Sequence, residues 1–174
     1  MVFEIRDARD EDGPALIEII GAAFTDYPGC VLDVDGEMPE LRAIASSFQR
    51  IGGRFWVAAS GERVLGGVGL SPSVAPPLDL APPAPAGVEL RKLYVDRRER
   101  RAGVGRALCD RVEREARARG AAFVELWTDT RFETAHKLYE ARGYVAGRRG
   151  EGRITRELHD LSGSVEYYYR LALG

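Results

Sequence analysis

The stretch from Gly87 to Gly120 constrains the fold more than any other part of the sequence. It combines a β-favouring apolar run, an arginine-rich turn with two glycines, and a long amphipathic pattern. From Val104 onward the apolar residues Val104, Leu108, Val112 and Ala116 recur every four positions, which is typical of one face of a helix. We therefore predict a strand, a tight turn and a helix that begins at the glycines.

A helix that begins in this way favours a phosphorylated ligand. The first amides of a helix lack intrahelical acceptors and carry partial positive charge. The turn Arg100-Arg101-Ala102-Gly103-Val104-Gly105, followed by Arg106, adds full positive charges at the same end. A surface turn with a solvated arginine face accounts for the same residues, so this pattern alone leaves both interpretations open.

Composition excludes several classes of function. A formal net charge of -2 argues against general nucleic-acid binding, which is typical of basic domains. Two cysteines, Cys30 and Cys109, make neither a disulfide framework nor a metal pattern, so no metal is expected. Without a signal-peptide pattern or a long apolar run, the expected location is cytoplasmic, with no membrane partner. The 174 residues are expected to form a single domain, 1–174.

Periodicity predicts the other elements in chain order. Before the central stretch we expect a strand at residues 2–6, a helix from Asp10 or Asp12 to about Tyr27, an irregular segment at 27–37, a helix ending at Gly52-Gly53, and a hairpin of 54–60 and 63–70. Residues 71–86 hold six prolines and are expected to form a long loop. After it we expect a strand at 122–127, a helix capped by Thr128-Asp129-Thr130 and closed at Arg142-Gly143, a short strand at Tyr144-Val145, and a last strand at 165–173. Residues 147–163 are polar and interrupted by glycines, and the patterns do not determine which structure they adopt.

Two motifs carry a resemblance to a known family. R-x-x-G-x-G at residues 100–105 and A-x-x-L-Y-E-x-x-G-Y at residues 135–144 follow one another in an order that resembles the GCN5-related N-acetyltransferase (GNAT) superfamily. The resemblance implies an α/β (α+β) fold. Its mixed, mostly antiparallel sheet has six to seven strands, about four helices cover both faces, and the fourth and fifth strands splay apart. It also implies an acetyl-CoA-dependent N-acetyltransferase.

The resemblance assigns residues to the cofactor. The backbone of the glycine turn would bind the pyrophosphate, through Arg100, Arg101, Ala102, Gly103, Val104, Gly105 and Arg106. The pantetheine arm would pair with the strand edge at Leu93, Tyr94 and Val95, and the Leu93 amide would polarise the thioester carbonyl. Ala135 of the second motif also belongs to this set. Phe132 stands where the family often has an Asn that contacts pantetheine, which leaves Thr130 as the substitute.

Catalysis needs an acid and a base. The resemblance makes Tyr139 the general acid for the departing thiolate; the alternative is a core tyrosine on an apolar helix face. Because a primary amine is mostly protonated at neutral pH, a base is also required. Glu89 on the central strand is the first candidate for this base, followed by Glu125 and then His159. Alternatively, Glu89 or Glu125 could form an ion pair with an arginine such as Arg91.

The acceptor is the least constrained part of the prediction. Asp26, Asp33, Asp35 and Glu37 lie between the first two helices, a region that in this superfamily commonly walls the acceptor site. With Tyr27, Glu89 and Glu125, they favour a cationic amine such as an amino acid, a polyamine or an aminoglycoside; a solvated acidic loop is the alternative. Tyr167, Tyr168 and Tyr169 either line a pocket or pack a strand.

We therefore predict an N-acetyltransferase that transfers the acetyl group of acetyl-CoA to a small-molecule amine by direct attack in a ternary complex. The alternatives are a protein or ribosomal N-terminal acetyltransferase and a non-catalytic acyl-CoA-binding sensor. A homodimer remains open.

Overall fold

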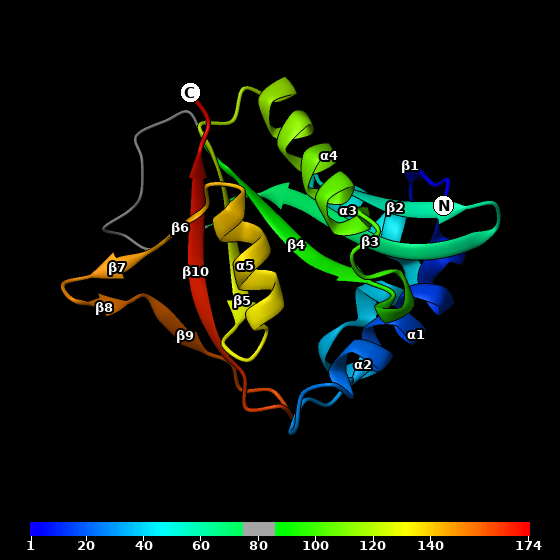
Figure 1. The fold of residues 1–174 in the computed structure, drawn as a ribbon, viewed down its shortest axis with the longest axis horizontal. Coiled ribbons are helices and arrows are strands. Elements are labelled where there is room, and N and C mark those ends of the chain that lie inside the picture. The colour runs from blue at the N-terminus through cyan, green and yellow to red at the C-terminus, as the bar shows by residue number, and fades with distance from the viewer. Residues whose placement is uncertain (75–85) are drawn as a thin grey trace.

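A single mixed sheet organises the computed structural model, which describes residues 1–74 and 86–174 (Figure 1). Its strand order is β1-β2-β3-β4-β5-β10-β6, with β9 also paired to β10. The strands are β1 Glu4–Asp7, β2 Arg54–Ser60, β3 Arg63–Pro72, β4 Val88–Val95, β5 Phe123–Asp129, β6 Val145–Ala146, β9 Thr155–Glu157 and β10 Val165–Ala172. A separate small ribbon pairs β7 Arg148–Arg149 with β8 Gly152–Arg153. This is the predicted sheet with its edge extended by short strands.

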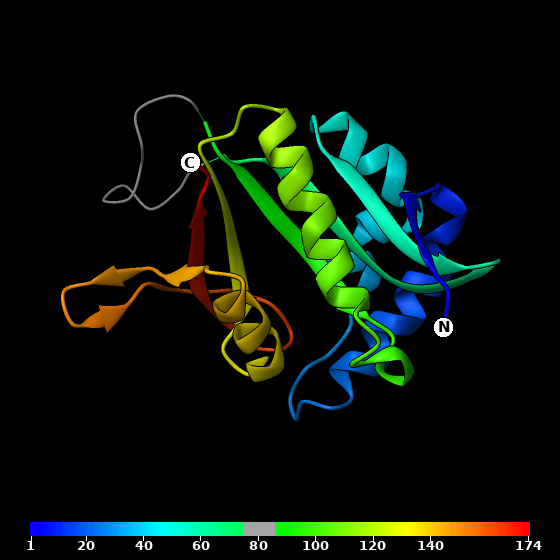
Figure 2. The ribbon, with the colours of Figure 1, turned by 45° about the horizontal axis from the view of Figure 1, so that its top comes forward.

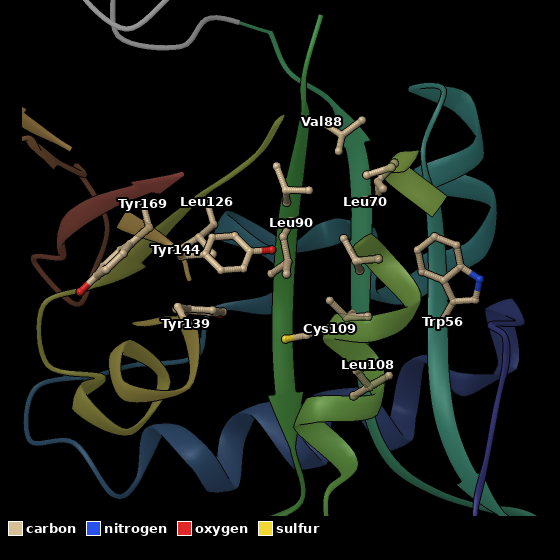
Figure 3. Packing of buried hydrophobic residues seen from close by; sticks show 14 of the residues in the cluster. Trp56, Leu70, Val88, Leu90, Leu108, Cys109, Leu126, Tyr139, Tyr144 and Tyr169 are labelled. Atoms are coloured by element: carbon tan, nitrogen blue, oxygen red, sulfur yellow. The ribbon is translucent and has the colours of Figure 1, made fainter. Parts of the chain in front are cut away.

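Helices cover both faces of the sheet, as predicted (Figure 2). They are α1 Gly13–Phe24, α2 Val34–Glu37, α3 Ile44–Arg50, α4 Val104–Ala118 and α5 Glu133–Ala141, with 3-10 turns at Asp10–Asp12, Pro39–Ala43 and Arg97–Glu99. Leu16, Ile20 and Phe48 bury α1 and α3 in one cluster, whereas Leu108 and Tyr139 bury α4 and α5 in another (Figure 3). No helix in the described ranges has the length and apolar character needed to cross a membrane.

The sheet splays between β4 and β5, which confirms the expected opening. These two strands are parallel and pair only at Val88 with Val124 and at Glu89 with Glu125. Beyond Glu89 they diverge, as the green and yellow strands of Figure 1 show. The remainder of β4 therefore keeps one edge without a strand partner.

A bulge in β4 lies inside this opening. The pairing with β3 passes from Arg91 opposite Gly69 to Tyr94 opposite Gly67, so Lys92 and Leu93 together oppose a single residue. Lys92 has a φ of 52°, a left-handed conformation that is uncommon for a residue with a side chain. Because an extra residue bends its strand, the bulge changes the direction of β4 at the point where the opening begins.

Several local predictions were wrong. The first helix ends at Phe24 rather than near Tyr27, and the segment predicted to be irregular contains α2. Thr128 and Asp129 belong to β5, and α5 begins later with Phe132 as its N-cap residue, without a side-chain cap. Residues 147–163 form β7, β8 and β9. Most of the predicted loop at 71–86 lies outside the described residues.

Candidate active site

A cleft of about 740 Å³ extends from β4 to the start of α4; we call it the α4 cleft. Its lining includes Leu93, Tyr94 and Val95 of β4, Ala135 of α5, and the complete turn of Arg100, Arg101, Ala102, Gly103, Val104, Gly105 and Arg106. Eleven of the thirteen residues predicted to contact the cofactor therefore line this cleft, and the other two, Thr130 and Tyr139, lie outside its lining. The structure thus brings together a glycine turn and an open strand edge.

The α4 end of this cleft is rich in free hydrogen-bond donors. The first helical bond joins the Ala107 N–H to the Gly103 carbonyl at 3.0 Å, so the preceding amides of Val104, Gly105 and Arg106 have no recorded acceptor in the described chain. Gly103 has a φ of 84°, and a Cβ there would meet nothing within 4 Å. These amides therefore border open space, which is the arrangement that suits a phosphate group.

Two of the arginines in this turn are available to an anion. Arg101 and Arg106 have no recorded ion pair or hydrogen bond among the described residues, and both side chains are exposed. Arg100 differs, because its Nη2 lies 2.9 Å from Oδ2 of Asp26. The residues present therefore fit a diphosphate: free amides, space above a glycine, and two unpaired guanidinium groups.

A second cavity, of about 400 Å³, lies at the opening between β4 and β5; we call it the β4–β5 pocket. It shares Leu93, Tyr94, Phe132 and Ala135 with the α4 cleft. The two cavities therefore adjoin at the bulge of β4. A molecule in the cleft and a second molecule in the pocket would meet at these shared residues.

Phe132 takes part in a way that sequence reasoning missed. Its ring centroid lies 4.8 Å from that of Tyr27 and 6.1 Å from that of Phe24, so it joins α1 to the start of α5. Thr130 instead uses its backbone N–H to bond the Val165 carbonyl and lines neither cavity. The sequence indicated the special role of Phe132 only through the absence of the Asn that the family often has at this position.

Tyr139 belongs both to the core and to the wall of the β4–β5 pocket. Its ring packs 5.7 Å from that of Tyr144 and 6.2 Å from that of Tyr169 (Figure 3). Within the described chain its hydroxyl has no recorded hydrogen-bond partner, and it is not among the fully enclosed polar atoms. Burial raises the pKa of this phenol well above its ordinary value, so Tyr139 stays protonated and able to donate.

Glu89 and Glu125 lie side by side in the sheet but differ in their contacts. Glu125 is buried and accepts hydrogen bonds from the Tyr168 hydroxyl, at 2.6 Å, and from Ser73. Glu89 lines the pocket and has no recorded hydrogen bond or ion pair with a described residue. Burial raises the pKa of Glu89, against the opposing effect of nearby Arg91. Glu89 is therefore the carboxylate that is free to accept a proton.

The other predicted acceptor residues are used elsewhere. Asp33 caps α2 by accepting from the Gly36 N–H at 3.0 Å, and exposed Asp35 pairs with Arg42. Neither lines either cavity, and Tyr27 lines the α4 cleft rather than the pocket. Asp33 and Asp35 are therefore engaged in local contacts outside both cavities, whereas Glu37 of the same acidic stretch lines the β4–β5 pocket.

The segment before β10 lines part of the pocket through Leu158, His159 and Asp160. The side chain of Ser162 accepts from the Val31 N–H at 2.8 Å and donates to the Val31 carbonyl at 3.1 Å. The Leu161 N–H donates to Glu37 at 2.6 Å. His159, the third candidate base, is exposed and lines the pocket in this segment. These bonds connect parts of the chain that sequence reasoning left without predicted structure.

Comparison with known proteins agrees with this architecture. Residues 15–144 match the model of the acetyltransferase (GNAT) family. The chain belongs to this family. A mouse relative, probable N-acetyltransferase family 8 member 5, is 34% identical over 126 residues, which are 72% of this chain and 51% of the relative. The chain spans about half the length of the curated relatives it matches.

Solved structures show the same GNAT fold. An acetyltransferase of the GNAT family from Staphylococcus aureus Mu50 superposes with a TM-score of 0.75 at 23% identity, covering 99% of this chain and 100% of that one. A Salmonella typhimurium protein, named as an acetyltransferase and solved with its cofactor acetyl-CoA, has a TM-score of 0.68 at 18% identity and covers 100% and 95%.

Proposed function

We propose that this chain transfers the acetyl group of acetyl-CoA to the amine of a small molecule by direct attack in a ternary complex. The meeting of two cavities at Leu93, Tyr94, Phe132 and Ala135 carries this proposal. One cavity ends in free amides and guanidinium groups, and the other contains an unpaired carboxylate and a protonated phenol. Acetyl-CoA, when bound, supplies an acetyl group activated as a thioester.

The α4 cleft would hold the cofactor along its length. The amides of Val104, Gly105 and Arg106, with the side chains of Arg101 and Arg106, would bind the pyrophosphate. The β4 edge at Leu93 and Val95 would pair with the amide groups of the pantetheine arm, as an added strand would. The Leu93 amide is the donor assigned to the acetyl carbonyl oxygen, where negative charge develops during attack.

The β4–β5 pocket would hold the acceptor and move its protons. Glu89 would take a proton from the ammonium, directly or through a water, and so free the lone pair for attack. Tyr139 would donate a hydrogen bond or a proton to the sulfur as the bond to the acetyl carbon breaks. Both residues belong to the pocket lining, and neither the Glu89 carboxylate nor the Tyr139 hydroxyl has a recorded hydrogen bond or ion pair with another described residue.

The size of the pocket supports a small acceptor. About 400 Å³ is within the range of small-molecule sites. Leu158, His159 and Asp160 form part of its lining, and the adjoining bonds of Ser162 with Val31 and of Leu161 with Glu37 hold this segment in place.

An amine panel tests the proposal. Release of CoA thiol is measured with acetyl-CoA and amino acids, polyamines, aminoglycosides and short peptides. Turnover of a small amine supports the proposed function, whereas turnover of peptides alone would favour an N-terminal protein acetyltransferase. Stabilisation by acetyl-CoA with no turnover of any amine would favour a non-catalytic sensor.

A further inference from the structure

The cations that line the β4–β5 pocket are not equivalent. Lys92 Nζ lies 2.7 Å from Glu40 Oε1, and Arg156 Nε lies 2.5 Å from Glu166 Oε2. Both positive charges are therefore neutralised by the protein. Arg91, which lines the same pocket, has no recorded ion pair or hydrogen bond among the described residues.

Arg91 is held in place without using its hydrogen-bond donors. Its guanidinium carbon lies 5.6 Å from the centre of the Phe48 ring, and Phe48 is fixed in the core at 1% exposure. A contact with a ring face occupies the plane of a guanidinium and leaves the N–H groups at its edge available. Arg91 is half-buried, so an anion bound there would be partly shielded from water.

The acids of the pocket show the same pattern. Asp129 pairs with Arg131 at 2.7 Å, Asp160 accepts from the Ser164 N–H at 2.8 Å, and Glu37 and Glu166 have the partners given above. Glu89 is the acid of this lining without a recorded partner in the described chain. Among the described charged residues of this pocket, ion pairs and hydrogen bonds within the protein thus leave one cation, Arg91, and one anion, Glu89, without such a partner.

These two free charges lie on the same face of β4. Positions 89 and 91 are two residues apart, which places their Cα atoms about 6.8 Å from one another and their side chains on one side of the strand. The positive charge of Arg91 acts on the Glu89 carboxylate, yet the two side chains form no recorded ion pair. A ligand with a cationic and an anionic group separated by one or two carbons would fit both.

Building on the proposed function, we propose that the acceptor is an amino-carboxylate, an amino acid or a close derivative, with its amine at Glu89 and its carboxylate on Arg91. A guanidinium matches a carboxylate in a two-point hydrogen bond, which fixes the orientation of the ligand. A polyamine or an aminoglycoside would instead bring a second positive charge toward Arg91 and leave its donors unsatisfied. The pocket should therefore prefer a zwitterionic acceptor to a purely cationic amine.

Matched acceptors test this proposal in the unmodified protein. CoA release is measured with the protein amino acids, with the primary carboxamide of each, and with spermidine. The best amino acid is expected to exceed its carboxamide in kcat/KM by about 10- to 100-fold, the effect of losing one charged hydrogen-bonding group. The carboxamide has the less basic amine, so a shortage of free amine does not explain such a loss.

Substitutions of Arg91 test whether this residue causes the preference for an amino acid over its carboxamide. Arg91→Gln should bring the ratio between amino acid and carboxamide close to one, and Arg91→Lys should retain part of the preference, because it keeps the charge without the fork. Arg114→Gln, at an exposed position of α4, is the matched control and should keep the original ratio.

The outcomes separate this proposal from the proposed function. Turnover of spermidine or peptides with no preference for amino acids would overturn the amino-carboxylate assignment and leave acetyl transfer intact. An unchanged ratio in Arg91→Gln would overturn the role of Arg91. Absence of turnover with every acceptor, despite binding of acetyl-CoA, would overturn both.

Discussion

Tyr139 and Tyr144 are neighbouring core tyrosines with different surroundings. Tyr139 borders the β4–β5 pocket, whereas the Tyr144 hydroxyl is fully enclosed, has no recorded partner and points toward Leu90 in Figure 3. Comparing the two tyrosines therefore tests the proposed catalytic hydroxyl of Tyr139 against the buried hydroxyl of Tyr144.

Tyr139→Phe should lower kcat by about 100-fold and leave acetyl-CoA affinity nearly unchanged, because the ring is kept and the proton donor is lost. Tyr144→Phe is the control. It should keep turnover and raise stability by about 1 kcal/mol, since it removes a buried hydroxyl without a partner. Steady-state kinetics and thermal unfolding of both variants check this, and equal turnover in Tyr139→Phe and the parent would remove Tyr139 from the acid role.

The proposed role of Glu89 as the base predicts a pH dependence of the activity. Burial raises its pKa, so kcat/KM should fall on acidification at a pH above the ordinary range of a glutamate. Glu89→Gln should lower kcat/KM by about 100-fold and abolish this acidic limb. A pH–rate profile of both proteins measures the effect, and an unchanged limb in Glu89→Gln would assign it to another group.

Glu89→Gln, which should lower the activity, should raise the stability of the folded protein. Because the folded-state pKa of Glu89 is raised, the native state binds its proton more tightly than the unfolded state, and the charged form destabilises the fold as pH rises. Glu89→Gln should therefore stabilise the protein at neutral pH, and the gain should vanish below the ordinary glutamate pKa. Urea unfolding at two pH values tests the sign.

At the scale of elements, the start of α4 is the feature to which the proposed function assigns the cofactor pyrophosphate. Gly103 and Gly120 flank this helix, with φ values of 84° and 70°, and a Cβ at either position would meet nothing within 4 Å. They impose the same conformational requirement, but only Gly103 lines the α4 cleft. Substituting each glycine in turn therefore separates the effect of backbone strain, which both positions share, from the effect of a side chain on ligand binding, which concerns Gly103 alone.

Gly103→Ala and Gly120→Ala should each cost about 1 kcal/mol of stability, because a left-handed conformation is unfavourable for alanine. Only Gly103→Ala should also weaken acetyl-CoA binding, by about 10-fold or more, since the added methyl group enters the space above the free amides. Calorimetric titration with acetyl-CoA is the measurement. Equal affinity in the two variants would place the pyrophosphate elsewhere.

At the scale of the whole molecule, the opening between β4 and β5 places the two cavities against each other. The parallel pairing ends at Glu89, and the bulge at Lys92 and Leu93 lies just beyond it. A ligand that bridges β4, α4 and α5 would connect segments that the sheet itself leaves apart. Binding of such a ligand should therefore raise the free energy of unfolding of the whole protein.

Acetyl-CoA at one hundred times its dissociation constant should stabilise the protein by about 2.7 kcal/mol, because it binds only the folded state. Thermal unfolding over a series of acetyl-CoA concentrations checks this, with adenosine as a ligand that lacks both pyrophosphate and pantetheine. No shift in the melting temperature at saturating acetyl-CoA would contradict the proposed function at its first step.

Local patterns in the sequence determined most of the elements. The hairpin of β2 and β3, the strand β4 and the glycine turn before α4 are all set by residues adjacent in the chain: apolar β-favouring runs, Gly61 at the hairpin turn and Gly103 at the helix start. The same is true of Tyr139, Glu89 and the turn at 100–106 as site candidates, because their motifs are contiguous.

Only the tertiary structure decided which charged groups are free. Arg100 finds Asp26 at a separation of 74 residues, Glu125 is engaged by Tyr168, and Lys92 by Glu40, so none of these can be read as available from sequence spacing. Glu89 and Arg91, which lie where β4 parts from β5, have no recorded hydrogen bond or ion pair with another described residue. Ion pairing depends on distances through space, and those distances are set when the sheet opens and the helices pack, not by the order of residues along the chain.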